Sequence, residues 1–166
     1  MEGEELPSRY LIVANQTLGG DALVEVVTAR DRLGPATFHI VVPATPTVDD
    51  VLGAGAMYGG VLGAEGLAVP VDVDDSSTSH ERAQRRLAAA FTRFHSLGIN
   101  VSGEVGDPDP IKAITRALER HDVDEIIVST LPPGISRWLR LDLVQRVRRR
   151  FDLPVTHVYA EEPAST

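Results

Sequence analysis

Short apolar runs alternate with segments of helical periodicity along most of the chain, and this alternation limits the fold more than any other feature. Apolar runs of about five residues that end in turn residues are typical of buried strands. The predicted strands cover residues 10–14, 37–42, 101–105, 125–128 and 155–159. Between them, helical patterns predict helices over residues 21–33, 78–97, 107–118 and 143–151.

This order of elements predicts the fold class. Strands that alternate with helices form a parallel sheet with helices on both faces, so we expect an α/β fold with three layers, α/β/α, around five parallel strands. We expect the strand order 3-2-1-4-5, in which the winding reverses between the first and fourth strands. Doubly wound sheets bind ligands outside the carboxyl ends of the strands at that position. The polar residues that follow these two strands are therefore the candidate site.

Composition narrows the class of protein. The 166 residues are long enough for one hydrophobic core, so we expect a single domain, 1–166, with a flexible glycine-rich insertion at about 48–76. The chain contains no cysteine, which excludes a disulfide framework and a thiolate nucleophile. A net charge of −8 argues against a nucleic-acid partner, and no apolar run has the roughly 20 residues of a membrane span. We expect a cytoplasmic protein that binds neither nucleic acid nor membrane.

Motifs for catalysis or metal binding are not recognisable. The glycines of residues 53–60 are followed by Val61 and Leu62, where a phosphate-binding loop needs Lys and Ser or Thr. The histidines are scattered, and His80 has no second histidine four residues later, as a helical zinc motif requires. We therefore assign no catalytic residue, no metal ligand and no definite cofactor.

Polar and cationic residues after the first and fourth strands form a candidate ligand site. Backbone amides and the Arg137 and Arg140 guanidinium groups could hold a phosphate or a carboxylate, so a nucleotide or a phosphate-like anion is the ligand class we expect. Asp142 and Gln145 have the spacing of a capping pair for the last helix. The candidate ligand-binding residues are Asn15, Gln16, Thr17, Ser129, Thr130, Gly134, Ser136, Arg137 and Arg140.

The order of elements and the stretch DEIIVSTLPPGISRWLRLDLVQRV, followed by LPVTHV, resemble the universal stress protein family, and the resemblance covers nearly the whole chain by pattern. The resemblance implies a fold like that of the adenine nucleotide alpha hydrolases. In that family a Gly-x2-Gly-x9-Gly-Ser/Thr loop wraps the phosphates of ATP. The corresponding positions here are Ser129, Pro132, Asp142 and Leu143, and Asn15 stands where the family often has an acid. The sequence therefore resembles a divergent branch that lacks the glycine-rich ATP loop.

Our leading hypothesis for function is a regulatory or stress-response domain that binds a small anionic ligand or nucleotide between the first and fourth strands, without clear catalysis. We also expect a homodimer through the fifth strand, because an outer strand exposes unpaired amides on one side and many members of the family pair there. One alternative is a nucleotide- or phosphate-hydrolysing enzyme of the same superfamily. Another is a dimeric interaction module with no small-molecule ligand. The sequence does not identify the ligand, the signal or any protein partner.

Overall fold

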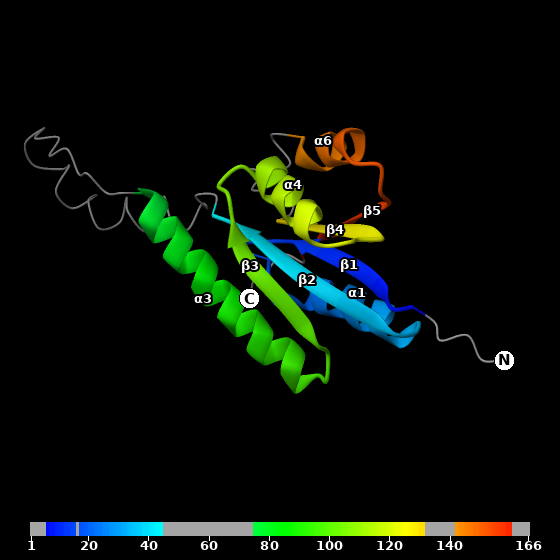
Figure 1. Ribbon diagram of the computed structural model, residues 1–166. Coiled ribbons are helices and arrows are strands. Elements are labelled where there is room, and N and C mark those ends of the chain that lie inside the picture. Colours follow the sequence, from blue (N-terminus) through cyan, green and yellow to red (C-terminus); the bar gives the residue numbers. More distant parts are fainter. Residues whose placement is uncertain (1–5, 16, 45–74, 132–141, 161–166) are drawn as a thin grey trace, which may run out of the picture.

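The computed structural model describes residues 6–15, 17–44, 75–131 and 142–160 of the chain. These residues form a five-stranded sheet in the order β3-β2-β1-β4-β5, in which all neighbouring strands are parallel (Figure 1). The elements in chain order are β1 (Ser8–Val13), α1 (Asp21–Arg32), β2 (Ala36–Pro43), α3 (Asp75–Ser96), β3 (Val101–Gly106), α4 (Pro110–Arg120), β4 (Glu125–Thr130), α6 (Leu143–Arg150) and β5 (Val155–Tyr159). The predicted fold class and strand order are confirmed.

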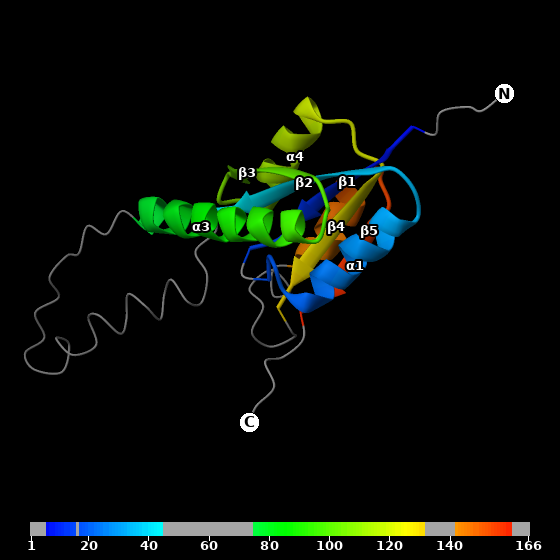
Figure 2. The same ribbon diagram turned by 90° about the horizontal axis from the view of Figure 1, so that it is seen from below.

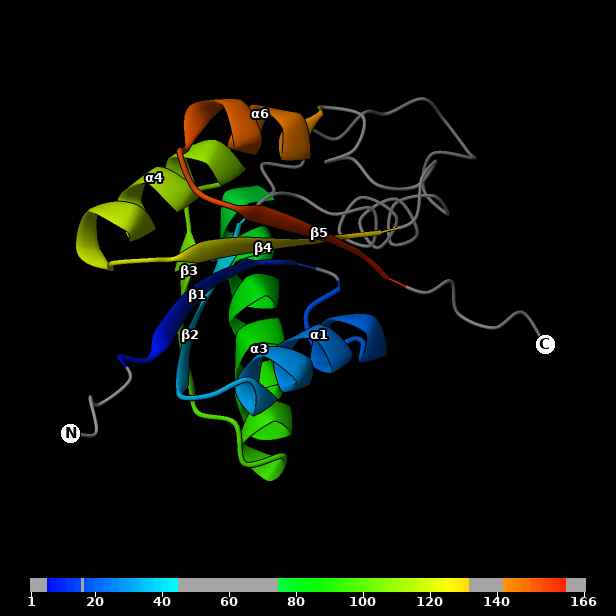
Figure 3. The same cartoon turned by 90° about the vertical axis from the view of Figure 1, so that its right-hand side faces the viewer.

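The helices form two layers, one on each face of the sheet. In Figure 3, α4 and α6 lie on one side of the strands, and α1 and α3 lie on the other. Seen from below in Figure 2, α3 runs along β2 and β3, while α1 lies beside β4 and β5. Right-handed crossovers between parallel strands place successive helices in this way.

Alternation along β1 explains why its sequence is apolar without interruption. Tyr10 and Ile12 belong to the core beneath α1 and α3, whereas Leu11 and Val13 belong to the core beneath α4 and α6. Because β1 lies between β2 and β4 in the middle of the sheet, both of its faces are buried. A central strand of this kind is the easiest element to predict from a continuous apolar run.

Two local signals fix the position of α4 against the sheet. The carboxylate of Asp109 accepts a hydrogen bond from the backbone N–H of Ile111 (2.9 Å) and caps the helix. Above β3, a Cβ built on Gly106 would lie 2.8 Å from Cβ of Ala113, so glycine lets the helix approach the strand closely. The helix start that the sequence predicts near residue 107 is confirmed at Pro110.

Some predictions fall on parts of the chain outside this description. The glycine-rich insertion at about 48–76 lies outside the described residues, apart from the start of α3. Helix α3 begins at Asp75, three residues before the predicted start at 78. Within the described ranges, no helix combines the length and the apolar character needed to cross a membrane.

Candidate functional site

Polar residues are buried where β1 and β4 end, side by side in the middle of the sheet. Asn15 and Thr17 follow β1, and Ser129 and Thr130 end β4; all four are at most 6% exposed. The winding of the sheet reverses between these two strands. Four predicted site residues therefore lie at the position where doubly wound sheets bind ligands.

Asn15 connects the end of β1 to two other elements. Its Nδ2 donates a hydrogen bond to the carbonyl oxygen of Pro43 at the end of β2 (2.9 Å). Its Oδ1 accepts one from a guanidinium nitrogen of Arg86 in α3 (2.7 Å). A hydrogen bond from a charged donor is stronger than a neutral one, so Arg86 holds the side chain of Asn15 in a defined orientation.

The loop that follows β1 is held from both sides. Thr17 donates its hydroxyl hydrogen to the carbonyl oxygen of Ser129 (3.2 Å), which joins this loop to the end of β4. On the side of α3, Arg93 forms hydrogen bonds with the carbonyl oxygen of Gly19 and with the carboxylate of Asp21. These contacts fix the backbone of the loop beside β4.

The hydroxyl groups at the end of β4 differ in their partners. The Oγ1 of Thr130 lies 2.8 Å from Nε2 of His157 in β5. Burial, and next the charge of Arg148, lower the pKa of His157, so its neutral form is favoured. In contrast, Oγ of Ser129 is buried without a hydrogen-bond partner among the described residues. An unpartnered buried hydroxyl costs free energy, which a hydrogen bond to a ligand or to a neighbouring chain segment would recover.

The remaining predicted site residues, Gln16, Gly134, Ser136, Arg137 and Arg140, lie outside the described residues. The anion-binding role of Arg137 and Arg140 therefore stays a prediction. Of the nine predicted site residues, the structure brings four together at the ends of β1 and β4, namely Asn15, Thr17, Ser129 and Thr130.

The structure of Asp142 differs from the prediction that this residue caps the last helix. It precedes α6 with a left-handed backbone (φ 54°, ψ 38°), and its side chain makes no capping hydrogen bond. A capping residue typically has an extended backbone, and because Asp142 makes no capping hydrogen bond, its predicted pairing with Gln145 is wrong. The carboxylate instead pairs with Arg149 (3.2 Å). Left-handed backbone is the conformation that glycine adopts most easily, and the resemblance aligns a glycine of the family's loop with this residue.

The sequence analysis missed two residues of this region, Arg86 and His157. Arg86 follows Ala83 by three residues and precedes Ala90 by four, and both alanines are buried. This spacing puts Arg86 at the edge of the buried helix face, and that signal could have identified it. His157 gave no such signal, because its partner Thr130 lies in a different strand.

Comparison with known proteins supports the fold. No protein-family model matches the chain, and neither does any curated protein. Among solved structures, a universal stress protein from Archaeoglobus fulgidus is 13% identical with a TM-score of 0.53, covering 92% of this chain and 94% of that one. A protein described only as hypothetical, PH0823, is 17% identical with a TM-score of 0.57, covering 93% and 98%.

A universal stress protein family protein from Arabidopsis thaliana, solved with AMP bound, is 9% identical to this chain with a TM-score of 0.54. The match covers 96% of this chain and 97% of that one. At these identities, the similarity establishes a shared fold. The resemblance that the sequence suggested is therefore confirmed as a universal stress protein-like fold.

Proposed function

We propose that this chain is a divergent universal stress protein-like domain with a regulatory role, and that it binds a small anionic ligand at the carboxyl ends of β1 and β4. The observation that carries the proposal is the group of buried polar side chains at this position, above all the unpartnered hydroxyl of Ser129. The protein with AMP bound shares the fold, which supports a nucleotide or its phosphate as the ligand class.

The described part of the site favours binding over catalysis. Thr130 and His157 form a hydroxyl–imidazole pair. Activation of a nucleophile also needs a third group that orients the base, and among the described residues no carboxylate contacts His157. A domain that binds the anion without converting it is the function that this geometry supports best, and the cytoplasm is the compartment that we propose for it.

Ligand binding can be measured directly with AMP and inorganic phosphate as probes. We expect calorimetry to detect binding of one of them, and the double variant Arg137→Ala/Arg140→Ala to weaken it at least about tenfold, since charged hydrogen bonds contribute about 1.5–3 kcal/mol each. Arg32→Ala is the matched control, because Arg32 is exposed in the last turn of α1. Unchanged binding in the double variant would place the anion elsewhere.

The same samples distinguish the two alternative functions. Release of phosphate from ATP or AMP, lost in the Thr130→Ala variant, would favour a hydrolase. Failure of every probe to bind or to raise the melting temperature would favour an interaction module without a small-molecule ligand. Both results would contradict the proposed function.

A further inference from the structure

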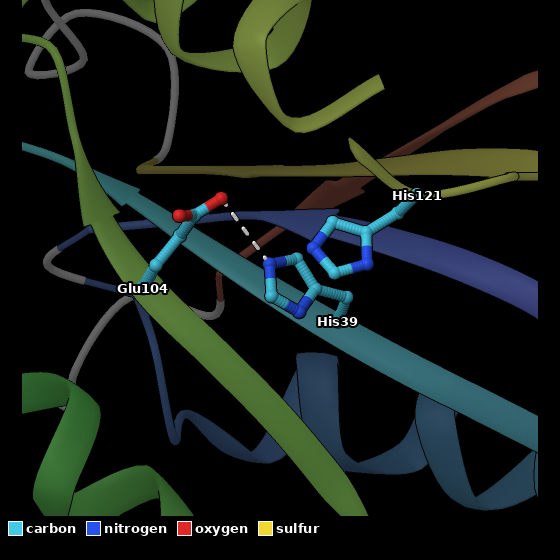
Figure 4. A group of neighbouring side chains, drawn as sticks. All are labelled: His39, Glu104 and His121. Carbon is cyan, nitrogen blue, oxygen red and sulfur yellow. Dashed lines mark hydrogen bonds and ion pairs between the residues drawn. The ribbon is translucent and has the colours of Figure 1, made fainter. Parts of the chain in front are cut away.

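Two imidazoles and a carboxylate lie close together on the sheet face that α4 and α6 cover. This cluster is separate from the proposed anion site at the carboxyl ends of β1 and β4. Figure 4 shows His39 of β2, Glu104 of β3 and His121, which follows α4, pointing toward one another. Nε2 of His39 lies 3.3 Å from Oε1 of Glu104. The rings of His39 and His121 are stacked with their centres 4.0 Å apart.

The donor atoms have nearly the spacing that a small metal ion needs. One nitrogen or oxygen atom from each of the three residues lies within 4.8 Å of the other two. Zinc binds nitrogen and oxygen ligands at about 2.0–2.1 Å, so the ligands of a tetrahedral site lie roughly 3.4 Å apart. Because the two rings are stacked, the ring of His121 must rotate before its lone pair points at the same ion as that of His39. All three side chains are only partly buried, which leaves space for this rotation.

A serine orients His39 for metal binding. Oγ of Ser102 lies 2.8 Å from Nδ1 of His39, and the serine hydroxyl donates to the carbonyl oxygen of Phe38 (3.5 Å). When Ser102 donates to Phe38, Nδ1–H of His39 donates to Ser102, and the lone pair of Nε2 faces Glu104. An outer hydrogen bond of this kind fixes the tautomer of many metal-binding histidines. In the other tautomer, Ser102 donates to Nδ1, and Nε2–H donates to Glu104.

In the first tautomer, a lone pair faces a carboxylate oxygen, and only a proton or a metal cation can lie favourably between them. A metal cation held by Nε2 of His39 and Oε1 of Glu104 would interact favourably with both atoms.

We propose that His39, Glu104 and His121 bind a divalent transition metal ion, and that Zn²⁺ is the preferred ion. Imidazole favours zinc, copper or nickel over magnesium or calcium, and two imidazoles with one carboxylate is a known zinc ligand set that leaves the fourth position open. Beside the cluster lies an open groove of about 360 Å³, lined by Thr37, Ser102, Arg120 and Asp122 among others. Water or a small ligand can reach the fourth position of the metal from this groove.

Arg120 competes with the metal for the carboxylate of Glu104. Its guanidinium lies 2.6 Å from both carboxylate oxygens of Glu104, and its side chain is 55% exposed. A carboxylate has lone pairs for about four partners, so Glu104 can bind a metal with one oxygen while Arg120 keeps the other. The positive charge of Arg120 lowers metal affinity, so its removal should raise it.

The proposal goes beyond the anion site and departs from the sequence analysis, which assigned no metal ligand. Sequence spacing could not reveal the cluster, because its residues come from β2, β3 and the end of α4. Their proximity depends on the pairing of β2 with β3 and on the position of α4 over them.

Calorimetry with ZnCl2 tests the site, with the full chain free of a histidine tag. We expect one equivalent of Zn²⁺ to bind. His121→Ala and Glu104→Gln should each weaken binding at least about 100-fold, which is more than the loss of a residue that only hydrogen-bonds a ligand would cause. His95→Ala, which removes an exposed histidine of α3, is the matched control and should bind as the unmodified chain does. Co²⁺ should give the visible absorption of a four- or five-coordinate ion, and this signal should disappear in His121→Ala.

Arg120→Gln separates a metal site from a simple ion-pair network, and it does not alter a proposed ligand. Tighter Zn²⁺ binding in this variant would support the proposal. The proposal is overturned if the unmodified chain binds no stoichiometric Zn²⁺, if His121→Ala binds it equally well, or if Arg120→Gln binds it less tightly. Thermal unfolding of each metal-free variant, followed by circular dichroism, verifies that it is folded.

Discussion

Arg86 in α3 donates a hydrogen bond to Oδ1 of Asn15 at a distance of 2.7 Å, so a helix on one face of the sheet fixes the end of its central strand. The two residues are 71 positions apart in the sequence. Through this contact, the packing of α3 determines how Asn15 is presented at the proposed ligand site. Orientation of site residues by a charged partner on a rigid element is a common means of preorganisation.

Loss of this contact should destabilise the fold. We expect Arg86→Ala to lower the free energy of unfolding by about 1–2 kcal/mol, because it removes a partly buried, charge-assisted hydrogen bond. The neighbouring Arg85 is exposed, and Arg85→Ala should change stability by less than about 0.5 kcal/mol. Urea unfolding followed by circular dichroism measures both, and equal effects would contradict the assigned role of Arg86.

The left-handed backbone at Asp142 predicts an unusual order of substitutions. Asp142→Gly should leave the free energy of unfolding within about 1 kcal/mol of the original, because glycine adopts φ 54° without strain. Asp142→Val should lower it by roughly 1–2 kcal/mol, since a β-branched side chain opposes this conformation. Asp142→Asn tests the ion pair with Arg149 separately. A glycine variant less stable than the valine variant would contradict this explanation.

Stability should depend on pH through His157. Burial, followed by the charge of Arg148, lowers its pKa below the ordinary value of 6.5. The unfolded chain therefore binds the proton more readily than the folded chain. The contribution of neutral His157 to stability is complete above a pH of about 6.5, and it is lost as the pH falls toward the lower pKa of the folded state. Between pH 7.5 and pH 5, an interval that brackets the ordinary pKa of histidine, we expect the His157→Gln variant to lose less stability than the original chain. The same loss in His157→Gln as in the original chain would show that other groups cause it.

ATP with Mg²⁺ should bind weakly or not at all. Asp142 is an exposed carboxylate at a position where the family's loop has glycine, and Pro132 replaces a second glycine and lacks an amide hydrogen. A carboxylate near the phosphates repels them, and a missing amide removes a donor. Calorimetry that gave a low micromolar dissociation constant for MgATP would disprove this interpretation of the loop.

A homodimer through β5 stays a prediction, and the structure sharpens its test. β5 is an outer strand of the described sheet, and the backbone N–H of Ala160 donates to Thr130 on the side of β4. Because amide directions alternate along a strand, the N–H of His157 points to the outer edge. His157→Pro should therefore convert a dimer to a monomer, whereas His157→Gln keeps the amide and should remain dimeric. Light scattering that reports a monomer for the original chain would end this hypothesis.

The strands and helices were predictable because their signals are local, and rules of topology limit the order in which parallel strands pair. Uninterrupted apolar runs marked the central strands, and the pair Asp109 and Pro110 marked the start of α4. For the candidate site, the winding rule placed Asn15 and Ser129 at neighbouring strand ends before any contact was known. Each of these inferences depends on residues adjacent in the chain or on a general rule of topology.

Tertiary structure alone decided the partners of those residues. Asn15 meets Arg86, Thr130 meets His157, and His39 meets Glu104, each across elements that are separated in sequence. The backbone at Asp142 likewise takes a conformation that its own residue type does not require. Sequence by itself determined where strands and helices form, because burial periodicity and capping act within a few residues. Which side chains share a site depends on how whole elements pack, and that packing arises from contacts spread over the entire chain.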